Sequence, residues 1–147
     1  MKTVALRFAE GFAPPEGTIA AHEQVISQMG YVWYGKLGAP LSEKTITAVM
    51  ANEAPRILLI HSGKSDRYWA YVSEIRRIVP DRDAIPTYYR DIADTIKCWF
   101  KVRRFEKASA DVMAHCTVAS SGIPLSLTSR SSMSPYFIIE YTDNREV

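Results

Sequence analysis

Aromatic and cationic side chains are interleaved along several β-rich segments of this 147-residue chain. Residues 30–36 read Gly-Tyr-Val-Trp-Tyr-Gly-Lys, residues 67–72 read Arg-Tyr-Trp-Ala-Tyr-Val, and residues 97–102 read Lys-Cys-Trp-Phe-Lys-Val. Aromatic faces stack on nucleobases, and lysine or arginine side chains neutralise phosphates. The pattern therefore indicates a module that binds nucleic acid before it indicates an enzyme.

No set of residues in the sequence is typical of catalysis. The three histidines and two cysteines lack the spacing of a metal site. Residues 63–65, Gly-Lys-Ser, match the end of a phosphate-binding loop, but the upstream glycine and the following helix are missing. The Gly-x-Ser-x-Gly pattern of many hydrolases is also absent. We therefore expect no catalytic residue, no metal ligand and no cofactor.

Three aromatic residues are the first candidates for contact with a base. Trp33 lies on a short expected strand, where its face either stacks on a base or packs in the core. Tyr88 and Tyr89 are adjacent in a polar segment that follows Pro86, a position that a core role explains less easily. The sequence does not show which of the two tyrosines turns inward.

Three further residues complete the predicted base-binding set. His22 offers a hydrogen-bonding edge, or it is an exposed residue of a helix. Ser62 follows an apolar strand, next to His61. Trp69 lies on the aromatic strand at residues 67–72, most of whose rings we expect in the core.

Charge supplies the predicted phosphate contacts. The net charge of +2 neither indicates nor excludes a nucleic-acid partner, because a local patch matters more than the total. The run Thr-Ser-Arg-Ser-Ser-Met-Ser at residues 128–134 combines hydroxyls, backbone donors and one cation, which suits a phosphate. The predicted phosphate-binding residues are Lys36, Lys64, Ser129 and Arg130.

Hydrophobic periodicity and turn residues predict the elements that position these side chains. Thr18 and Ser42 are expected to cap helices, and Gly30 to end the first. The expected helices cover residues 18–29, 43–52 and 109–115, with a turn or one helical turn within 87–96. The expected strands cover residues 3–8, 31–35, 56–61, 67–79, 97–105 and 136–141, and residues 120–135 are expected to form a loop.

These elements predict an α+β fold, with a curved or barrel-like mixed sheet flanked by two or three helices. At 147 residues the chain has the size of one domain. Cys98 and Cys116 are expected to be buried, reduced thiols. The sequence contains no signal-peptide core and no apolar run of membrane-spanning length, so we expect a cytoplasmic protein that does not enter a membrane.

The order of elements resembles the YTH and EVE domains of the PUA-like superfamily. The features that carry the resemblance run from residue 19 to 141: a helix followed by Gly-Tyr-Val-Trp, a second helix, an apolar strand, a Ser-Gly-Lys turn, an aromatic strand, and Trp-Phe-Lys-Val. The resemblance implies a six-stranded barrel that reads modified bases, such as N6-methyladenine in RNA or modified bases in DNA. It also implies a domain of a restriction or anti-phage protein, with a fused or associated nuclease or motor domain.

The same resemblance implies roles for individual residues. Trp33 matches a tryptophan of the aromatic cage, and Tyr88 or Tyr89 stands near the second cage wall, where the YTH pattern has tryptophan. His22 has the spacing of a polar residue that bonds the base, and Ser62 lies at the pocket floor. The first hypothesis is thus a reader of a modified base in DNA or RNA. The alternatives are a sensor or protein-interaction module that binds a small nucleotide or a partner, and an enzyme acting on nucleic acid.

Overall fold

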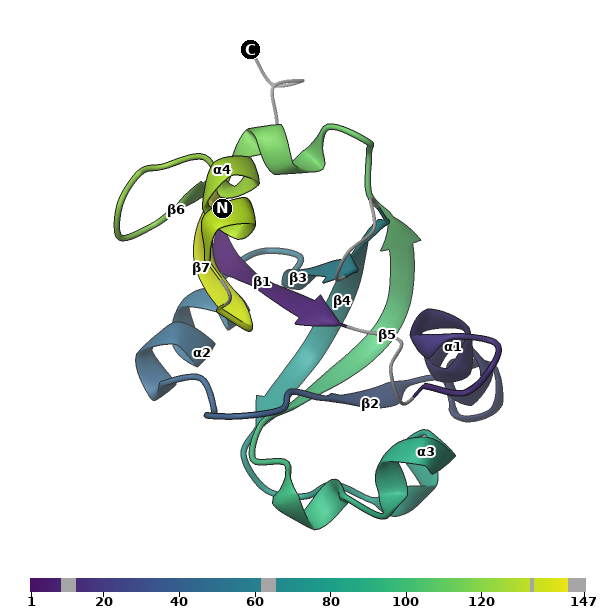
Figure 1. Cartoon of the computed structure of the whole chain (residues 1–147). Helices are drawn as coiled ribbons and strands as arrows, with labels where there is room; N and C mark the ends of the chain where they lie inside the picture. Colours follow the sequence, from purple (N-terminus) through teal and green to yellow (C-terminus); the bar gives the residue numbers. More distant parts are fainter. Residues whose placement is uncertain (9–12, 62–65, 133, 143–147) are drawn as a thin grey trace.

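A computed structural model of the chain describes residues 1–8, 13–61, 66–132 and 134–142. Within these residues, seven strands form one mixed sheet in the order β2-β5-β4-β3-β1-β7-β6 (Figure 1). The strands are β1 (Lys2–Phe8), β2 (Val32–Gly35), β3 (Arg56–His61), β4 (Arg67–Arg76), β5 (Trp99–Lys107), β6 (Cys116–Val118) and β7 (Tyr136–Tyr141). The α-helices are α1 (Thr18–Met29), α2 (Glu43–Met50), α3 (Thr87–Arg90) and α4 (Leu125–Ser131), and 3-10 turns lie at Arg82–Ala84, Ala93–Thr95 and Val112–His115.

The sheet is curved, so that strand β2 at one edge approaches strand β1 near the other end of the order. Strand β1 pairs in parallel with β3 and antiparallel with β7, whereas β3, β4, β5 and β2 form an antiparallel series. Strands β1 and β2 stand four places apart in the sheet, yet Leu6 of β1 and Tyr34 of β2 belong to one buried cluster. The predicted α+β fold with a curved mixed sheet is therefore confirmed.

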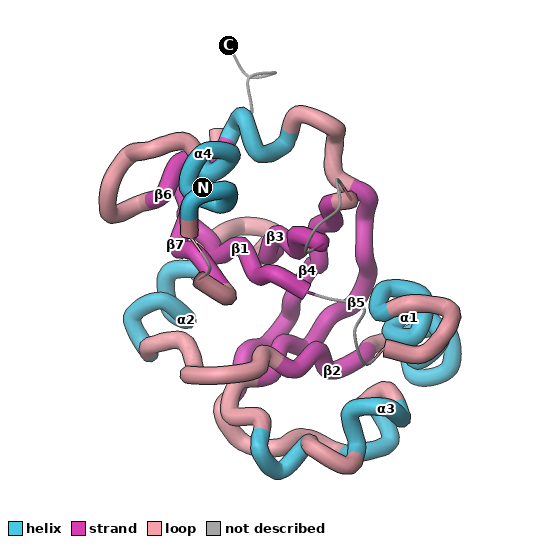
Figure 2. The backbone as a smooth tube through the Cα atoms, in the orientation of Figure 1, coloured by secondary structure: helices cyan, strands magenta, loops and turns pink. Residues whose placement is uncertain are grey.

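Helices lie around this sheet, with α1 and α3 on one side of β2 and α2 on the other side of the molecule (Figure 2). Helix α1 contacts β2 and β5, and α2 contacts β1 and β4. Gly30 ends α1 in the left-handed conformation, with φ of 83°, and its N–H donates to the Ile26 carbonyl at 2.7 Å. The Ser42 hydroxyl caps α2 by accepting from the Thr45 N–H at 3.1 Å. Both predicted signals are confirmed, but the N-cap of α1 is Gly17, and Thr18 is its first helical residue.

The segment 120–135 corrects the sequence prediction. It contains helix α4, although serine and threonine favour turns over helix interiors because their hydroxyls compete for backbone groups. Leu125 is completely buried in the cluster that joins β1, β3 and β7, so packing outweighs local propensity. Strand β6 was also missed, and it raises the sheet from the implied six strands to seven. The four α-helices exceed the two or three expected.

The ends of several elements also differ from those predicted from the sequence. Strand β4 ends at Arg76 and not at residue 79, and β5 runs two residues further than expected. The helix expected at 109–115 is a 3-10 turn that begins at Val112. Cys98 and Cys116 are buried, free thiols, as expected. Across the described ranges, no helix combines the length and the apolar character needed to cross a bilayer.

Candidate functional site

A cavity of about 200 Å³ opens where the curled sheet leaves β1 and β2 unpaired with each other. Its wall is made by five segments: the end of β1, the start of α1, strand β2 with the two residues after it, helix α3, and the residue before β7. The lining residues are Leu6, Arg7, Phe8, Thr18, Tyr34, Gly35, Lys36, Leu37, Tyr88, Tyr89 and Pro135. Drug-sized ligand pockets measure roughly 300–1,000 Å³, so this cavity suits one small, flat group.

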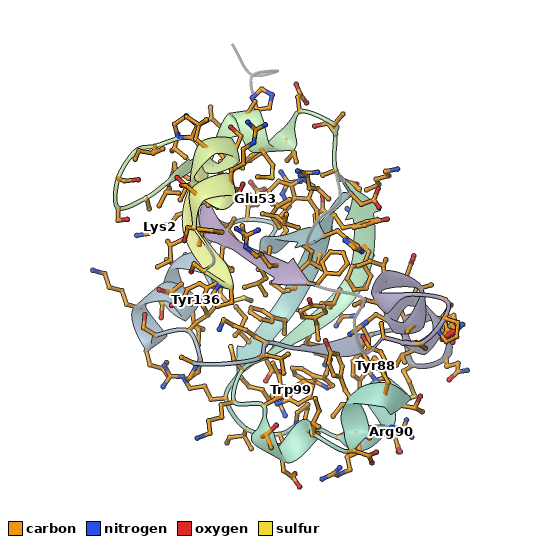
Figure 3. All side chains as sticks on the ribbon, viewed as in Figure 1. Lys2, Glu53, Tyr88, Arg90, Trp99 and Tyr136 are labelled. Atoms are coloured by element: carbon orange, nitrogen blue, oxygen red, sulfur yellow. The ribbon has the colours of Figure 1, made fainter. Side chains whose placement is uncertain are left out.

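Three tyrosines form the aromatic part of the wall. Tyr88 and Tyr89 of α3 stack on each other, with ring centroids 4.5 Å apart and an angle of 28° between the ring planes. Tyr34 of β2 lines the same cavity. Tyr88 lies between α1 and α3 (Figure 3) and is partly exposed. Tyr34 and Tyr89 are buried. The cavity thus has flat walls from two different elements.

His22 of α1 lies directly behind these tyrosines and is completely buried. Its ring centroid lies 5.0 Å from that of Tyr34, 5.6 Å from Tyr89 and 6.2 Å from Tyr88. Its Nδ1 lies 2.7 Å from the Thr18 carbonyl oxygen, and because that oxygen only accepts, Nδ1 carries the proton. Burial lowers the pKa of His22 to about 4, against the raising effect of this hydrogen bond. The ring is therefore neutral at physiological pH, and Nε2 has no hydrogen-bond partner in the described part of the chain.

Two cations stand at the cavity. Lys36 is 5% exposed, and its ammonium donates to the Ala39 carbonyl and lies 4.5 Å from the ring centroid of Tyr136. Burial lowers the pKa of Lys36. Arg7 donates from Nε to the Ser134 carbonyl at 2.9 Å and from Nη2 to the Ser132 carbonyl at 2.7 Å. These contacts hold both side chains in place at the cavity wall.

Gly35 of the cavity wall packs closely against the residues beneath it. A Cβ atom there would lie 3.0 Å from the Ile96 side chain and 3.1 Å from the Trp99 ring. These distances are too short for a side chain to enter without displacing its neighbours. The glycine therefore keeps β2 close to the residues beneath it and fixes where Tyr34 stands.

The structure places two predicted base-binding residues elsewhere. Trp33 is 3% exposed and packs with Ile85, Ile96 and Trp99, and the Arg76 guanidinium lies 4.5 Å from its ring centroid. Neighbouring residues of a strand point to opposite faces, so Tyr34 takes the cavity and Trp33 the core.

Trp69 is likewise 3% exposed, and it lies in the cluster that contains Leu58 and Phe137. Neither tryptophan lines the cavity. By contrast, both Tyr88 and Tyr89 line it, so both tyrosines face the cavity. Their contact with a base stays a prediction.

The residues predicted to contact phosphate also lie in different parts of the structure. Lys36 is buried in the wall of the tyrosine-lined cavity. Ser129 and Arg130 lie on helix α4 and not in a loop, and the Ser129 carbonyl accepts a hydrogen bond from Arg7. Arg130 is exposed. Ser62 and Lys64 lie outside the described residues.

Of the residues that line the cavity, the sequence predicted only Tyr88, Tyr89 and Lys36 as site residues, and it missed Tyr34, Phe8 and Arg7 among others. The alternation of β2 was a usable signal for Tyr34, because one of two adjacent aromatics on a strand has to face the opposite side. Phe8 and Arg7 carried no comparable signal. Their place in the wall depends on the pairing of the end of β1 with β3 and on the hydrogen bond from the Arg7 N–H to the Pro135 carbonyl, both of which join segments distant along the chain.

Comparison with known families agrees with this architecture. A family model described as Pua-like matches residues 4–134, which is most of the chain. The chain belongs to the PUA-like family. PUA-like domains commonly bind RNA or other nucleic acids, so a nucleic-acid partner is the expected one for this PUA-like domain. No curated protein and no solved structure matches the chain.

Proposed function

We propose that this PUA-like domain is an EVE/YTH-type reader that holds one modified nucleobase in the tyrosine-lined cavity. The observation that carries the proposal is the cavity of about 200 Å³ whose walls include Tyr34, Tyr88 and Tyr89. Stacking of a base on an aromatic side chain contributes roughly 1–3 kcal/mol. A methyl group on that base adds apolar area that aromatic walls and residues such as Leu6 and Phe8 accommodate.

The buried histidine supports a hydrogen bond to the base edge. Because Nδ1 of His22 is committed to the Thr18 carbonyl, its Nε2 is an acceptor. A buried acceptor without a partner costs roughly 1–3 kcal/mol, and a base that presents an N–H group would recover part of that cost. His22 does not itself line the cavity but lies against the tyrosines that do, so this contact requires one of those rings to turn aside on binding.

A base reaches such a cavity only when it is out of the helical stack. In a single strand this is already the case, whereas in a duplex the base has to be flipped out at a cost of a few kcal/mol. We place recognition, and not turnover, in this domain: the roles assigned to its residues are stacking and hydrogen bonding. Cleavage of a bound nucleic acid would belong to a fused or associated nuclease.

The decisive experiment compares Tyr88→Ala with Tyr31→Ala. Both tyrosines are partly buried and pack against the same cluster, but only Tyr88 lines the cavity. The binding of a panel of single-stranded oligonucleotides, each with one modified or unmodified base, is measured by fluorescence anisotropy at two salt concentrations. We expect Tyr88→Ala to weaken binding of the preferred modified oligonucleotide by roughly 1–3 kcal/mol, and Tyr31→Ala to leave it unchanged.

Three results would contradict the proposal. One is a folded Tyr88→Ala domain that binds every oligonucleotide as the wild type does. Another is a wild-type domain that does not distinguish any modified base from its unmodified form. The third is conversion of the oligonucleotide by the purified domain, provided that it disappears in a cavity variant.

A further inference from the structure

A row of alternating cationic and aromatic side chains crosses the sheet away from the cavity. In the register of the sheet, Arg56 of β3 stands opposite Tyr71 of β4, and Tyr71 stands opposite Arg104 of β5. None of the three lines the tyrosine cavity. We call this row, Arg56–Tyr71–Arg104, the arginine–tyrosine ladder.

Both guanidinium groups lie against aromatic rings. Arg104 lies 3.8 Å from the ring centroid of Tyr71. Arg56 lies 4.1 Å from the ring centroid of Trp69 and 5.3 Å from that of Tyr141, and its Nη1 donates to the Tyr71 hydroxyl at 3.1 Å. Stacking fixes the planes of the guanidinium groups and leaves N–H groups at their edges for an outside acceptor.

The ladder holds more positive than negative charge. Glu106 accepts from Arg104 Nη1 at 3.2 Å and lies 3.4 Å from the Tyr71 hydroxyl. Arg56 forms no ion pair with a carboxylate within the described ranges, so two cations share one anion. The Arg104 side chain is 58% exposed, and a phosphate can approach it from solvent.

An open cavity of about 570 Å³ adjoins the ladder and is lined by Arg56, Tyr71 and Tyr141, together with Asn52 and Glu53. Glu53 is exposed at this cavity and would repel a phosphate. The adjoining cavity therefore favours a base, which carries no net charge, and the Arg104 end of the ladder favours a phosphate. A flat base stacks on guanidinium planes and on aromatic rings alike.

We propose that the arginine–tyrosine ladder is a second, sequence-independent site for single-stranded nucleic acid. A backbone phosphate accepts hydrogen bonds from Arg104, and a neighbouring base lies against Arg56 and Tyr71. The inference rests on the proposed function only in taking nucleic acid as the partner. It does not require the tyrosine cavity to bind a base, because the two sites share no residue.

The test uses unmodified single-stranded RNA and DNA of about 12 nucleotides, within the length that single-strand-binding sites cover. Arg104→Gln and Arg56→Gln are each expected to weaken binding several-fold, for every sequence. Arg104→Gln is also expected to reduce the slope of log affinity against log salt by about 0.7, the value for one lost phosphate contact on a single strand. Arg56→Gln loses a contact with a base, so its slope is expected to change less than that of Arg104→Gln. Glu106→Gln is expected to tighten binding, since it removes the competing carboxylate.

Arg82→Gln is the matched control. Arg82 is 51% exposed and pairs with Asp94 at 2.9 Å, much as Arg104 pairs with Glu106. Unlike Arg104, it stacks on no ring among the described residues, and its replacement is expected to leave the affinity and the salt slope unchanged. The ladder proposal would be contradicted if folded Arg104→Gln bound with wild-type affinity and salt slope. It would also be contradicted if Arg82→Gln lost as much affinity as Arg104→Gln.

The two proposals fail in different ways. Failure of the cavity shows as Tyr88→Ala binding modified and unmodified strands like the wild type, with the ladder variants still weakened. Failure of the ladder shows as the reverse pattern. Binding by neither site overturns both.

Discussion

At the scale of single residues, the neutral His22 makes the domain sensitive to acid. Its pKa is about 4 in the folded chain because of burial, against 6.5 for an ordinary histidine. Between these two values the unfolded chain binds a proton at His22 and the folded chain does not. The free energy of unfolding therefore falls as the pH drops from 6.5 to about 4, by about 3 kcal/mol in total.

The variant His22→Phe isolates this contribution. Denaturant unfolding is measured at several pH values between 4 and 7 for the wild type and the variant. We expect the loss of stability below pH 6.5 to be smaller in the variant, and its stability at pH 7 to equal or exceed that of the wild type, because the unpartnered Nε2 is gone. An identical pH dependence in the two proteins would show that His22 is not the group responsible.

The candidate site was partly predictable from single residues. The adjacent Tyr88 and Tyr89 could be recognised as candidates because two aromatic residues in a short polar segment have to pack against another surface. Trp33 misled for a physical reason: a large ring suits a base and a core equally well, and only the strand's orientation decides between them. That orientation depends on which neighbour faces inward, and one sequence does not state it.

At the scale of elements, two glycines of the segment around β2 act through different mechanisms. Gly30 has φ of 83° with open space around it, so Gly30→Ala strains the backbone by about 1–2 kcal/mol. A Cβ atom at Gly35 would lie 3.0 Å from Ile96 and 3.1 Å from Trp99, so both have to shift by a few tenths of an ångström, and we expect Gly35→Ala to cost about 1–3 kcal/mol through overpacking.

The two variants are therefore expected to lower the free energy of unfolding alike but to affect the cavity differently. Gly35→Ala displaces β2 and Tyr34, and it should also weaken binding of the preferred oligonucleotide at temperatures where the domain stays folded. Gly30→Ala leaves the cavity wall in place and serves as the control. Equal affinities for the two variants would mean that the position of β2 does not control the cavity.

Local signals predicted most of the elements but not α4 or β6. Caps, glycine stops and periodicity identified α1, α2 and the central strands because each signal lies within its own segment. Helix α4 is held by the buried Leu125, and the three residues of β6 are held by pairing with β7. Contacts between distant segments stabilise both, so a reading of the local sequence does not reveal them.

At the scale of the whole molecule, the sheet order predicts a gradient of local stability. Strand β1 is paired on both sides, and Val4 and Ala5 are completely buried. Strand β6 lies at one edge and is three residues long. Hydrogen exchange measured by mass spectrometry is expected to be slowest for peptides from β1 and β3 and much faster for β6. Slower exchange in β6 than in β1 would contradict this order.

The pairing of β1 with β7 also has a consequence for synthesis. Lys2 stands opposite Glu140 and Ala5 opposite Phe137, so β1 meets one of its neighbours only after the ribosome has made residues 136–141. Contacts between such distant residues slow folding, because a long loop closes before they form. Until then the edge of β1 stays open to other chains, and we expect a nascent domain of this topology to depend on chaperones more than a protein built from sequential hairpins.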